Sequence, residues 1–149
     1  MQMYIESENI VGHEQAGFRQ YKSTEDQTTH LTQAISDTFQ AKKVILAVFI
    51  DLQKAFDKVW KDGLLLKLLR YGISGRMYNW TKSYLYNRRA RVLVDGQCGR
   101  KALLKQRVPQ GGVLPLTLFI LYMNDLIPEL PKGVHTASYA DDLVLWCTE

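Results

Sequence analysis

The feature that most constrains the fold is an uninterrupted apolar run over residues 44–50, "VILAVFI", which ends on Asp51. The run is short and rich in β-branched residues, which is typical of a strand buried on both faces. We therefore expect a central strand of a sheet here. An acidic residue at the point where such a strand stops lies at the rim of the sheet or is buried at a large energetic cost. Asp51 is thus the first candidate functional residue.

The composition predicts one globular domain with a real core, since 46% of the 149 residues are hydrophobic and 23% are charged. No apolar run approaches the roughly 18 residues of a membrane span, and the N-terminus lacks the basic and apolar regions of a signal peptide. The only cysteines are Cys98 and Cys147. A disulfide framework or zinc site is therefore not expected, and a reducing compartment is the default. The scattered histidines are expected to be surface or structural residues.

The net charge of +4 is mild, but basic residues concentrate between positions 75 and 107, where Asp95 is the only acid. The basic residues of this segment are Arg76, Lys82, Arg88, Arg89, Arg91, Arg100, Lys101, Lys105 and Arg107. Trp80, Tyr84 and Tyr86 lie among them. Basic and aromatic side chains together suit a phosphate backbone and stacked bases. A solvated basic surface without a ligand is the alternative reading.

Helical spacing predicts a helix that ends at Gln40. Ser23 or Thr24 can cap its start, with Asp26 or Gln27 reaching back to the backbone. Three apolar residues then recur at intervals of four: Leu31, Ile35 and Phe39.

Further helices are expected over residues 61–72, over 74–87 with Ser74 as the cap, and after a Gly-rich loop within 108–127. Pro115 suits the first turn of the last of these helices. The first of them should face a core with four leucines, Leu64, Leu65, Leu68 and Leu69.

Two hairpins complete the expected elements. Residues 90–104 should turn at Asp95-Gly96, and residues 135–147 should bend at Asp141-Asp142. The elements alternate without a strict βαβ rhythm. We therefore predict an α+β fold, with helices packed on one face of a mainly antiparallel sheet.

The acidic pair Asp141-Asp142 and Asp51 together suggest a cation site. If the two strands concerned are neighbours, three carboxylates converge at one rim of the sheet, and they repel one another unless cations bind. Mg²⁺ prefers oxygen ligands, and two ions about 3.5–4 Å apart can clamp the attacking and leaving oxygens of a phosphoryl transfer. An ordinary hairpin turn without such a role remains the alternative.

Four segments resemble motifs of one enzyme family. "AVFIDLQKAFDKVW", "RVPQGGVLPLTLFILYMNDL" and "SYADDLVLW", in that order, resemble the palm motifs of reverse transcriptases, above all those of the non-LTR, LINE-type retrotransposons. "HEQAGFRQYKSTEDQ" resembles the stretch of the fingers that precedes the palm in these enzymes. Each motif alone is weak evidence, but four in the right order and spacing are specific.

The resemblance implies roles for individual residues. Asp51 and Asp141 would be metal ligands, with Asp142 beside them in the acidic pair, and Leu52 would offer its backbone carbonyl to the metal of the incoming nucleotide. These residues would hold two Mg²⁺ ions, for which Mn²⁺ is a possible substitute. Tyr139 would touch the primer strand near its 3′ end.

The resemblance also implies a nucleotide pocket. Gln110 and Gly111 would line it next to the template, and Arg19 would be a candidate ligand of the triphosphate. Phe56 would occupy the sugar-gate position, where a rigid ring leaves no room for a 2′-hydroxyl. Without the resemblance, an ordinary core aromatic is the simpler interpretation of Phe56.

The activity implied is that of an RNA-directed DNA polymerase, with an RNA template, a DNA primer and deoxynucleoside triphosphates as partners, and no membrane. Residues 1–149 would form one partial domain, with about 1–43 from the fingers and about 44–149 mainly from the palm. The thumb and an endonuclease would belong to the remainder of a polyprotein. An intracellular site is expected, in the nucleus or the cytoplasm, and the family favours the nucleus. A non-catalytic remnant that binds nucleic acid and a metal-dependent nuclease stay open as alternatives.

Overall fold

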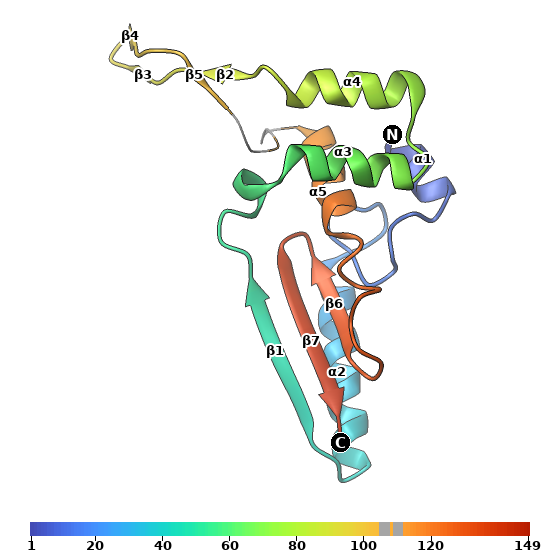
Figure 1. The fold of residues 1–149 in the computed structure, drawn as a ribbon. Coiled ribbons are helices and arrows are strands. Elements are labelled where there is room, and N and C mark those ends of the chain that lie inside the picture. Colours follow the sequence, from blue (N-terminus) through green and yellow to red (C-terminus); the bar gives the residue numbers. More distant parts are fainter. Residues whose placement is uncertain (105–107, 109–111) are drawn as a thin grey trace.

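A three-stranded antiparallel sheet and a layer of helices beyond one of its ends make up most of the molecule (Figure 1). The structure, a computed structural model, describes residues 1–104, 108 and 112–149. The sheet has the order β1-β7-β6, and its strands are β1 (Ile45–Asp51), β6 (His135–Tyr139) and β7 (Asp142–Thr148). The predicted α+β class with an antiparallel sheet is confirmed.

The strand order corrects one prediction. β7 pairs on both sides, so it is the central strand, and β1 lies at the edge. Leu46, Val48 and Phe49 of β1 are 64%, 48% and 75% exposed, so the expectation of a strand buried on both faces is wrong within this chain. The apolar run correctly indicated a strand, but composition carries no information about which neighbour each strand finds.

Helix α2 (Thr24–Gln40) lies along one face of the sheet and contacts β6 (Figure 1). Its start is the predicted capping box. The Ser23 hydroxyl accepts a hydrogen bond from the backbone N–H of Asp26 (3.2 Å), and the Asp26 carboxylate accepts one from the N–H of Ser23 (2.8 Å). Such reciprocal bonds satisfy backbone donors that the first helical turn leaves unpaired.

The main hydrophobic core lies among the helices beyond the end of the sheet, which are α1 (Gln2–Ser7), α3 (Lys61–Arg70), α4 (Gly75–Leu85) and α5 (Val113–Met123). Leu64, Leu65 and Leu68 of α3 are buried as predicted, whereas Leu69 is 45% exposed. At about 100° per residue, Leu69 falls at the margin of the arc that the other three leucines define. In α5 the consecutive residues 118–121 are all buried, so this helix is covered on nearly every side.

A long arm leaves the helical layer after α4 (Figure 1). It consists of two short ladders, β2 (Arg89–Ala90) with β5 (Ala102–Leu103) and β3 (Leu93–Val94) with β4 (Gln97–Cys98). Its tip is the predicted turn, where Asp95 and Gly96 have φ values of 47° and 78°. Two successive positive φ values match the twist of a tight hairpin.

Two smaller differences concern local boundaries. Ser74 occupies the predicted cap position of α4, but its side chain makes no capping hydrogen bond. The final hairpin bends at Ala140-Asp141 rather than at Asp141-Asp142, because Asp142 already pairs as the first residue of β7. Within the described part of the chain, no helix combines the length and the apolar character needed to cross a membrane.

Candidate active site

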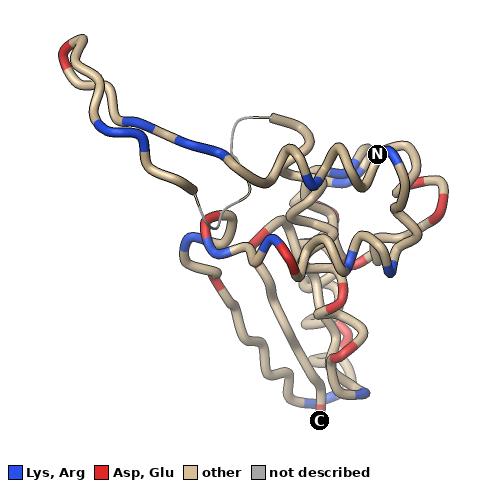
Figure 2. The backbone as a smooth tube through the Cα atoms, turned by 45° about the horizontal axis from the view of Figure 1, so that its top comes forward, with Lys and Arg blue, Asp and Glu red and all other residues tan. Residues whose placement is uncertain are grey.

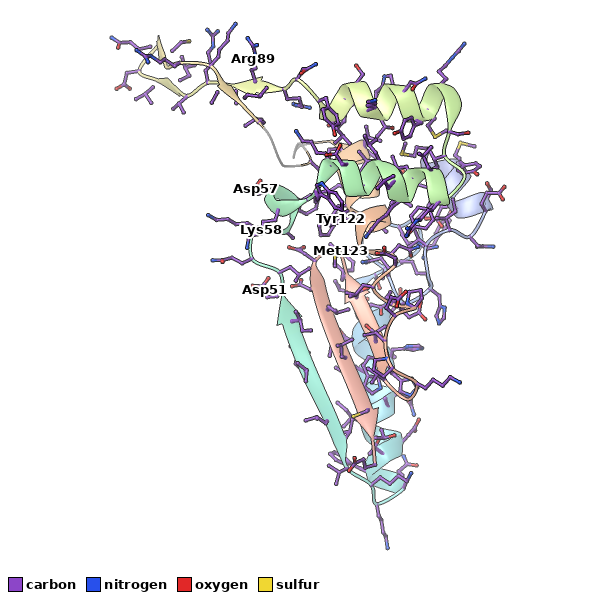
Figure 3. All side chains as sticks on the ribbon, in the orientation of Figure 1. Asp51, Asp57, Lys58, Arg89, Tyr122 and Met123 are labelled. Atoms are coloured by element: carbon purple, nitrogen blue, oxygen red, sulfur yellow. The ribbon has the colours of Figure 1, made fainter. Side chains whose placement is uncertain are left out.

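The antiparallel register of β1 and β7 brings two of the predicted acidic residues together. The pairing runs from Ile45 opposite Thr148 to Asp51 opposite Asp142, at the end of the sheet nearest the helices. Figure 3 labels Asp51 at this end of β1. Residues directly opposed across an antiparallel pair have Cβ atoms about 4.5–5.5 Å apart and share one face. The strands that the sequence left as possible neighbours are therefore neighbours.

Asp141 lies next to this pair, in the turn between β6 and β7, and is half-buried, whereas Asp51 and Asp142 are exposed. Ala140, the residue before it, has a φ of 59°. This left-handed conformation is uncommon for a residue with a Cβ atom. The turn thus carries one acidic residue at its bend and delivers the next to the start of β7.

The three carboxylates form an open set of ligands. Among the described residues, no three acidic, histidine or cysteine side chains stand close enough to make a preformed metal site. Nor does any described side chain form a hydrogen bond or ion pair with Asp51, Asp141 or Asp142. Mg²⁺ is usually held by one or two carboxylates together with waters and substrate phosphates. The donor chemistry and the open arrangement therefore fit Mg²⁺, whereas a closed, all-protein site is not formed.

The residues after Asp51 enter the short helix η1 (Ala55–Lys58). The carbonyl of Leu52 accepts a hydrogen bond from the N–H of Ala55 (3.1 Å), which leaves one of its two lone pairs for another partner. The ring of Phe56 stacks on Phe119 of α5, with centroids 4.2 Å apart and ring planes at 25°. This contact favours the core interpretation of Phe56, and its sugar-gate role stays a prediction.

Three further predicted residues are Tyr139, Gln110 and Gly111. Tyr139 is half-buried at the end of β6, and its ring centroid lies 6.3 Å from that of Phe18. Gln110 and Gly111 lie outside the described residues.

The guanidinium group of Arg19 is held by hydrogen bonds to residues 6–15 of the chain. It donates to both carboxylate oxygens of Glu6, at 2.8 and 3.2 Å, and to the carbonyl of Gly12 at 2.7 Å. Longer bonds reach the carbonyls of Val11 and Gln15, and the side chain is only 11% exposed. Contact with a triphosphate would require release from these partners, so this role stays a prediction.

One residue at the site was not singled out from the sequence. The buried amide of Gln15 accepts hydrogen bonds from the N–H groups of Gly17 (2.8 Å) and Ala140 (2.9 Å) and donates to the carbonyl of Ala140 (3.1 Å). The only signal in the sequence was its place in the stretch that resembles the fingers. That pattern does not reveal a contact with a turn 125 residues away.

The arm carries Lys and Arg residues along its length (Figure 2), and these cations are exposed. They include Arg89, Arg91, Arg100 and Lys101. At its base the Arg88 guanidinium lies 5.2 Å from the ring centroid of Tyr84, and Tyr84 stacks on Trp80 with centroids 5.6 Å apart.

Lys61 of α3 ties the base of the arm to the helices, because its ammonium donates to the carbonyl of Leu104 (2.7 Å). Burial lowers the pKa of Lys61, and the positive charge of Arg88 lowers it further. The arm is thus anchored at its base while its cations face solvent.

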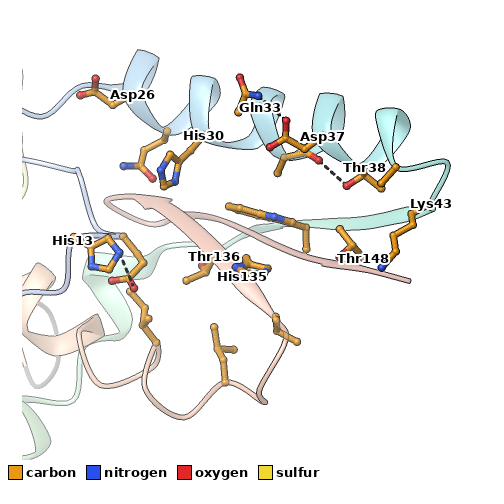
Figure 4. Close-up of a pocket in the computed structure, with 18 of the residues that line it drawn as sticks. His13, Asp26, His30, Gln33, Asp37, Thr38, Lys43, His135, Thr136 and Thr148 are labelled. Carbon is orange, nitrogen blue, oxygen red and sulfur yellow. Dashed lines mark hydrogen bonds and ion pairs between the residues drawn. The ribbon is translucent and has the colours of Figure 1, made fainter.

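A separate cavity of about 750 Å³ lies between α2 and the sheet (Figure 4). The histidines that looked scattered in the sequence, His13, His30 and His135, all contribute to its lining. The cavity is lined by none of the three candidate carboxylates, so it is distinct from the acidic end of the sheet.

The family model described as reverse transcriptase (RNA-dependent DNA polymerase) matches residues 1–149. The chain belongs to the reverse transcriptase family. Among curated proteins it is 39% identical over 142 residues to the "Probable RNA-directed DNA polymerase from transposon BS" of Drosophila melanogaster, covering 91% of this chain and 16% of that protein. It is 34% identical over 134 residues to the "RNA-directed DNA polymerase from mobile element jockey" of the same organism, covering 86% of this chain and 14% of that protein.

These matches confirm the resemblance to the polymerases of LINE-type retrotransposons. A more distant relative is the "Retrovirus-related Pol polyprotein from type-1 retrotransposable element R2" of Popillia japonica, at 27% identity over 114 residues. The match over residues 1–149 shows membership of the reverse transcriptase family. The chain spans only about 14–16% of the length of its first two relatives, so the activity of a whole protein is a proposal.

The opposed carboxylates lead to a first prediction, on stability. Asp142→Asn should stabilise the metal-free chain by about 0.5 kcal/mol, because like charges directly opposite in a sheet destabilise it. Urea unfolding in the presence of EDTA measures this. Glu129→Gln, at an exposed loop position, is the control and should leave the stability unchanged. Equal or lower stability of Asp142→Asn would contradict the expected repulsion between the two strand ends.

The Glu6–Arg19 ion pair leads to a second prediction, on pH. The hydrogen bond from Arg19 holds the pKa of Glu6 below its ordinary value of 4.5, although burial acts in the opposite direction. The stabilisation is therefore complete above about pH 4.5 and is lost as the pH falls through the lower pKa of the folded state. In thermal unfolding, Glu6→Gln should have a lower midpoint temperature than the unmodified chain at pH 7. The difference between the two midpoints should shrink below pH 4.5. A gap that is independent of pH would contradict this linkage.

Proposed function

We propose that the chain is the nucleotidyl-transfer segment of an RNA-directed DNA polymerase. The observation that carries the proposal is the register of β1 and β7, which sets Asp51 opposite Asp142 beside the turn with Asp141. An open end of a sheet with several carboxylates, none of which forms an ion pair with a described side chain, suits metal ions that arrive with a phosphorylated substrate.

In the proposed reaction, the 3′-oxygen of a primer attacks the α-phosphorus of a deoxynucleoside triphosphate. A new P–O bond forms to the primer, the bond between the α-phosphorus and its bridging oxygen breaks, pyrophosphate leaves, and the hydroxyl proton is lost to solvent. Asp51, Asp141 and Asp142, with the carbonyl of Leu52, would hold the two Mg²⁺ ions, or Mn²⁺ in their place. Bound there, such ions supply charge neutralisation and activation of the hydroxyl.

The remaining assignments extend this proposal to the substrate. Tyr139 would touch the primer end, and Gln110 and Gly111 would line the nucleotide pocket. Phe56 would reject ribonucleotides through its ring, and Arg19 would reach the triphosphate only after it leaves Glu6. The contact of Phe56 with Phe119 and the bonds of Arg19 make these two the assignments with least support.

We further propose that the arm binds the backbone of the template and primer. Its exposed cations and the Trp80–Tyr84 stack at its base offer charge and aromatic surface together. In the relatives such a segment belongs to a much longer protein. We propose the same setting here, with a thumb and an endonuclease elsewhere in the polyprotein, and action in the nucleus.

The third prediction tests the chemistry. In the full-length protein, Asp51→Asn and Asp141→Asn should each lower primer extension on an RNA template with Mg²⁺ by at least about 1000-fold (~4 kcal/mol in the barrier). The reason is that each removes a ligand of the reacting metals, while Glu129→Gln should retain full activity. Near-normal extension by either Asp variant would reject the polymerase assignment. Metal-dependent cleavage without extension would favour a nuclease, and nucleic-acid binding without either activity would favour a non-catalytic remnant.

The fourth prediction tests the arm. The double variant Arg89→Gln/Arg91→Gln should weaken binding of an RNA–DNA duplex and lower the slope of log K against log salt by about 1.8, since each phosphate contact contributes about 0.9. Fluorescence anisotropy at several salt concentrations measures both quantities. The matched control is Lys42→Gln/Lys43→Gln, which removes the same charge from exposed residues after α2. An equal loss in the two double variants would show that net charge alone, and not the arm, sets the affinity.

A further inference from the structure

The segment of residues 14–17 packs along β6 and reaches the turn that carries Asp141. Its backbone pairs with Ser138, because the N–H of Ala16 donates to the carbonyl of Ser138 and the N–H of Ser138 donates to the carbonyl of Glu14, both at 2.9 Å. Gln15 and Ser138 are partners in a parallel bridge. The segment therefore extends the free edge of β6 up to the turn.

The side chain of Gln15 then closes on the turn itself. Its amide oxygen accepts from the N–H of Ala140 and its amide nitrogen donates to the carbonyl of the same residue. The oxygen also accepts from the N–H of Gly17. Gln15 is 3% exposed, so these bonds form away from water, where an unmatched polar group is strongly unfavourable. One side chain thus satisfies both backbone groups of the residue that precedes Asp141.

This turn needs an outside constraint. Ala140 adopts a left-handed conformation, with φ at 59°, which persists in non-glycine residues only where the surroundings determine it. The repulsion expected between Asp142 and Asp51 also acts to open the end of the sheet. Gly17 allows the constraint to come close, because a Cβ atom added there would lie 2.2 Å from the backbone nitrogen of Ala140.

We propose that Gln15 is a positioning residue for the acidic site. It fixes Ala140, and through Ala140 it holds Asp141 and Asp142 in the placement from which they bind metal ions beside Asp51. The inference rests on the proposed function for the role of these carboxylates. The contacts require glutamine, because the side chain must offer an acceptor to two N–H groups and a donor to one carbonyl at the same time.

The experiment uses residues 1–149 and two measurements. Electron paramagnetic resonance of free Mn²⁺ gives the metal affinity, and amide hydrogen exchange by NMR gives the protection of the Ala140 and Gly17 N–H groups. Gln15→Met, of similar length but without the amide, should lose protection at both and bind Mn²⁺ at least about tenfold more weakly, as expected for groups that orient metal ligands. Protection within β1 should be unchanged.

Two further variants guard the interpretation. Ser138→Ala removes a hydroxyl that bonds to Glu14 (3.3 Å) in the same contact and leaves the turn untouched, so it should bind Mn²⁺ normally. Gln15→Asn keeps a polar group but shortens its reach, and it replaces Gln15→Met if circular dichroism shows that variant to be unfolded. It should weaken Mn²⁺ binding in the same direction.

The outcomes separate this inference from the proposed function. If Gln15→Met or Gln15→Asn binds Mn²⁺ as tightly as the unmodified chain, or if Ser138→Ala weakens binding equally, the positioning role is overturned while the metal site stands. If the unmodified chain and Asp141→Asn bind Mn²⁺ equally weakly, the proposed metal site fails, and the role of Gln15 fails with it.

Discussion

The candidate site depends on the antiparallel pairing of β1 with β7. A shift of one residue in this register would turn every side chain of one strand to the opposite face, and Asp51 would no longer stand opposite Asp142. The apolar side chains along the ladder do not by themselves exclude such a shift, because β1 is largely exposed. The register is better defined on the other side of β7, where a two-residue turn joins it to β6 and Trp146 is buried.

In this structure, residues 10–19 support the hairpin of β6 and β7. Asn124, after α5, accepts a hydrogen bond from the N–H of Gly12 (3.0 Å) and donates to the carbonyl of Ile10 (2.8 Å). Arg19 donates hydrogen bonds to the next carbonyls along the chain, those of Val11, Gly12 and Gln15. Residues 14–17 then continue along β6. This path links the core helix α5 to the acidic turn. It explains why a segment far away in the sequence belongs to the same site.

Much of this was predictable from local patterns. The capping box at Ser23, three of the four predicted core leucines of α3 and the turn at Asp95-Gly96 follow from patterns within a few residues, and the structure confirms them. The edge position of β1 could not be predicted, because an apolar strand looks the same whether its second neighbour lies in this chain or not. The contact between Gln15 and Ala140 was not predicted for a related reason. A polar residue outside any periodic pattern carries no information about a distant partner.

Under the proposed function, the distribution of charge would set the order in which the substrates bind. The carboxylates at this end of the sheet form no ion pair with a described side chain, so in this proposal a nucleotide would approach them together with cations. The arm carries mainly positive charge and projects away from this end of the sheet. In the same proposal, the arm would hold a nucleic acid through long-range, salt-sensitive attraction before any metal is present. In the proposed division of roles, the arm would supply affinity for nucleic acid, and the carboxylates would bind the phosphate that arrives with its metal ions.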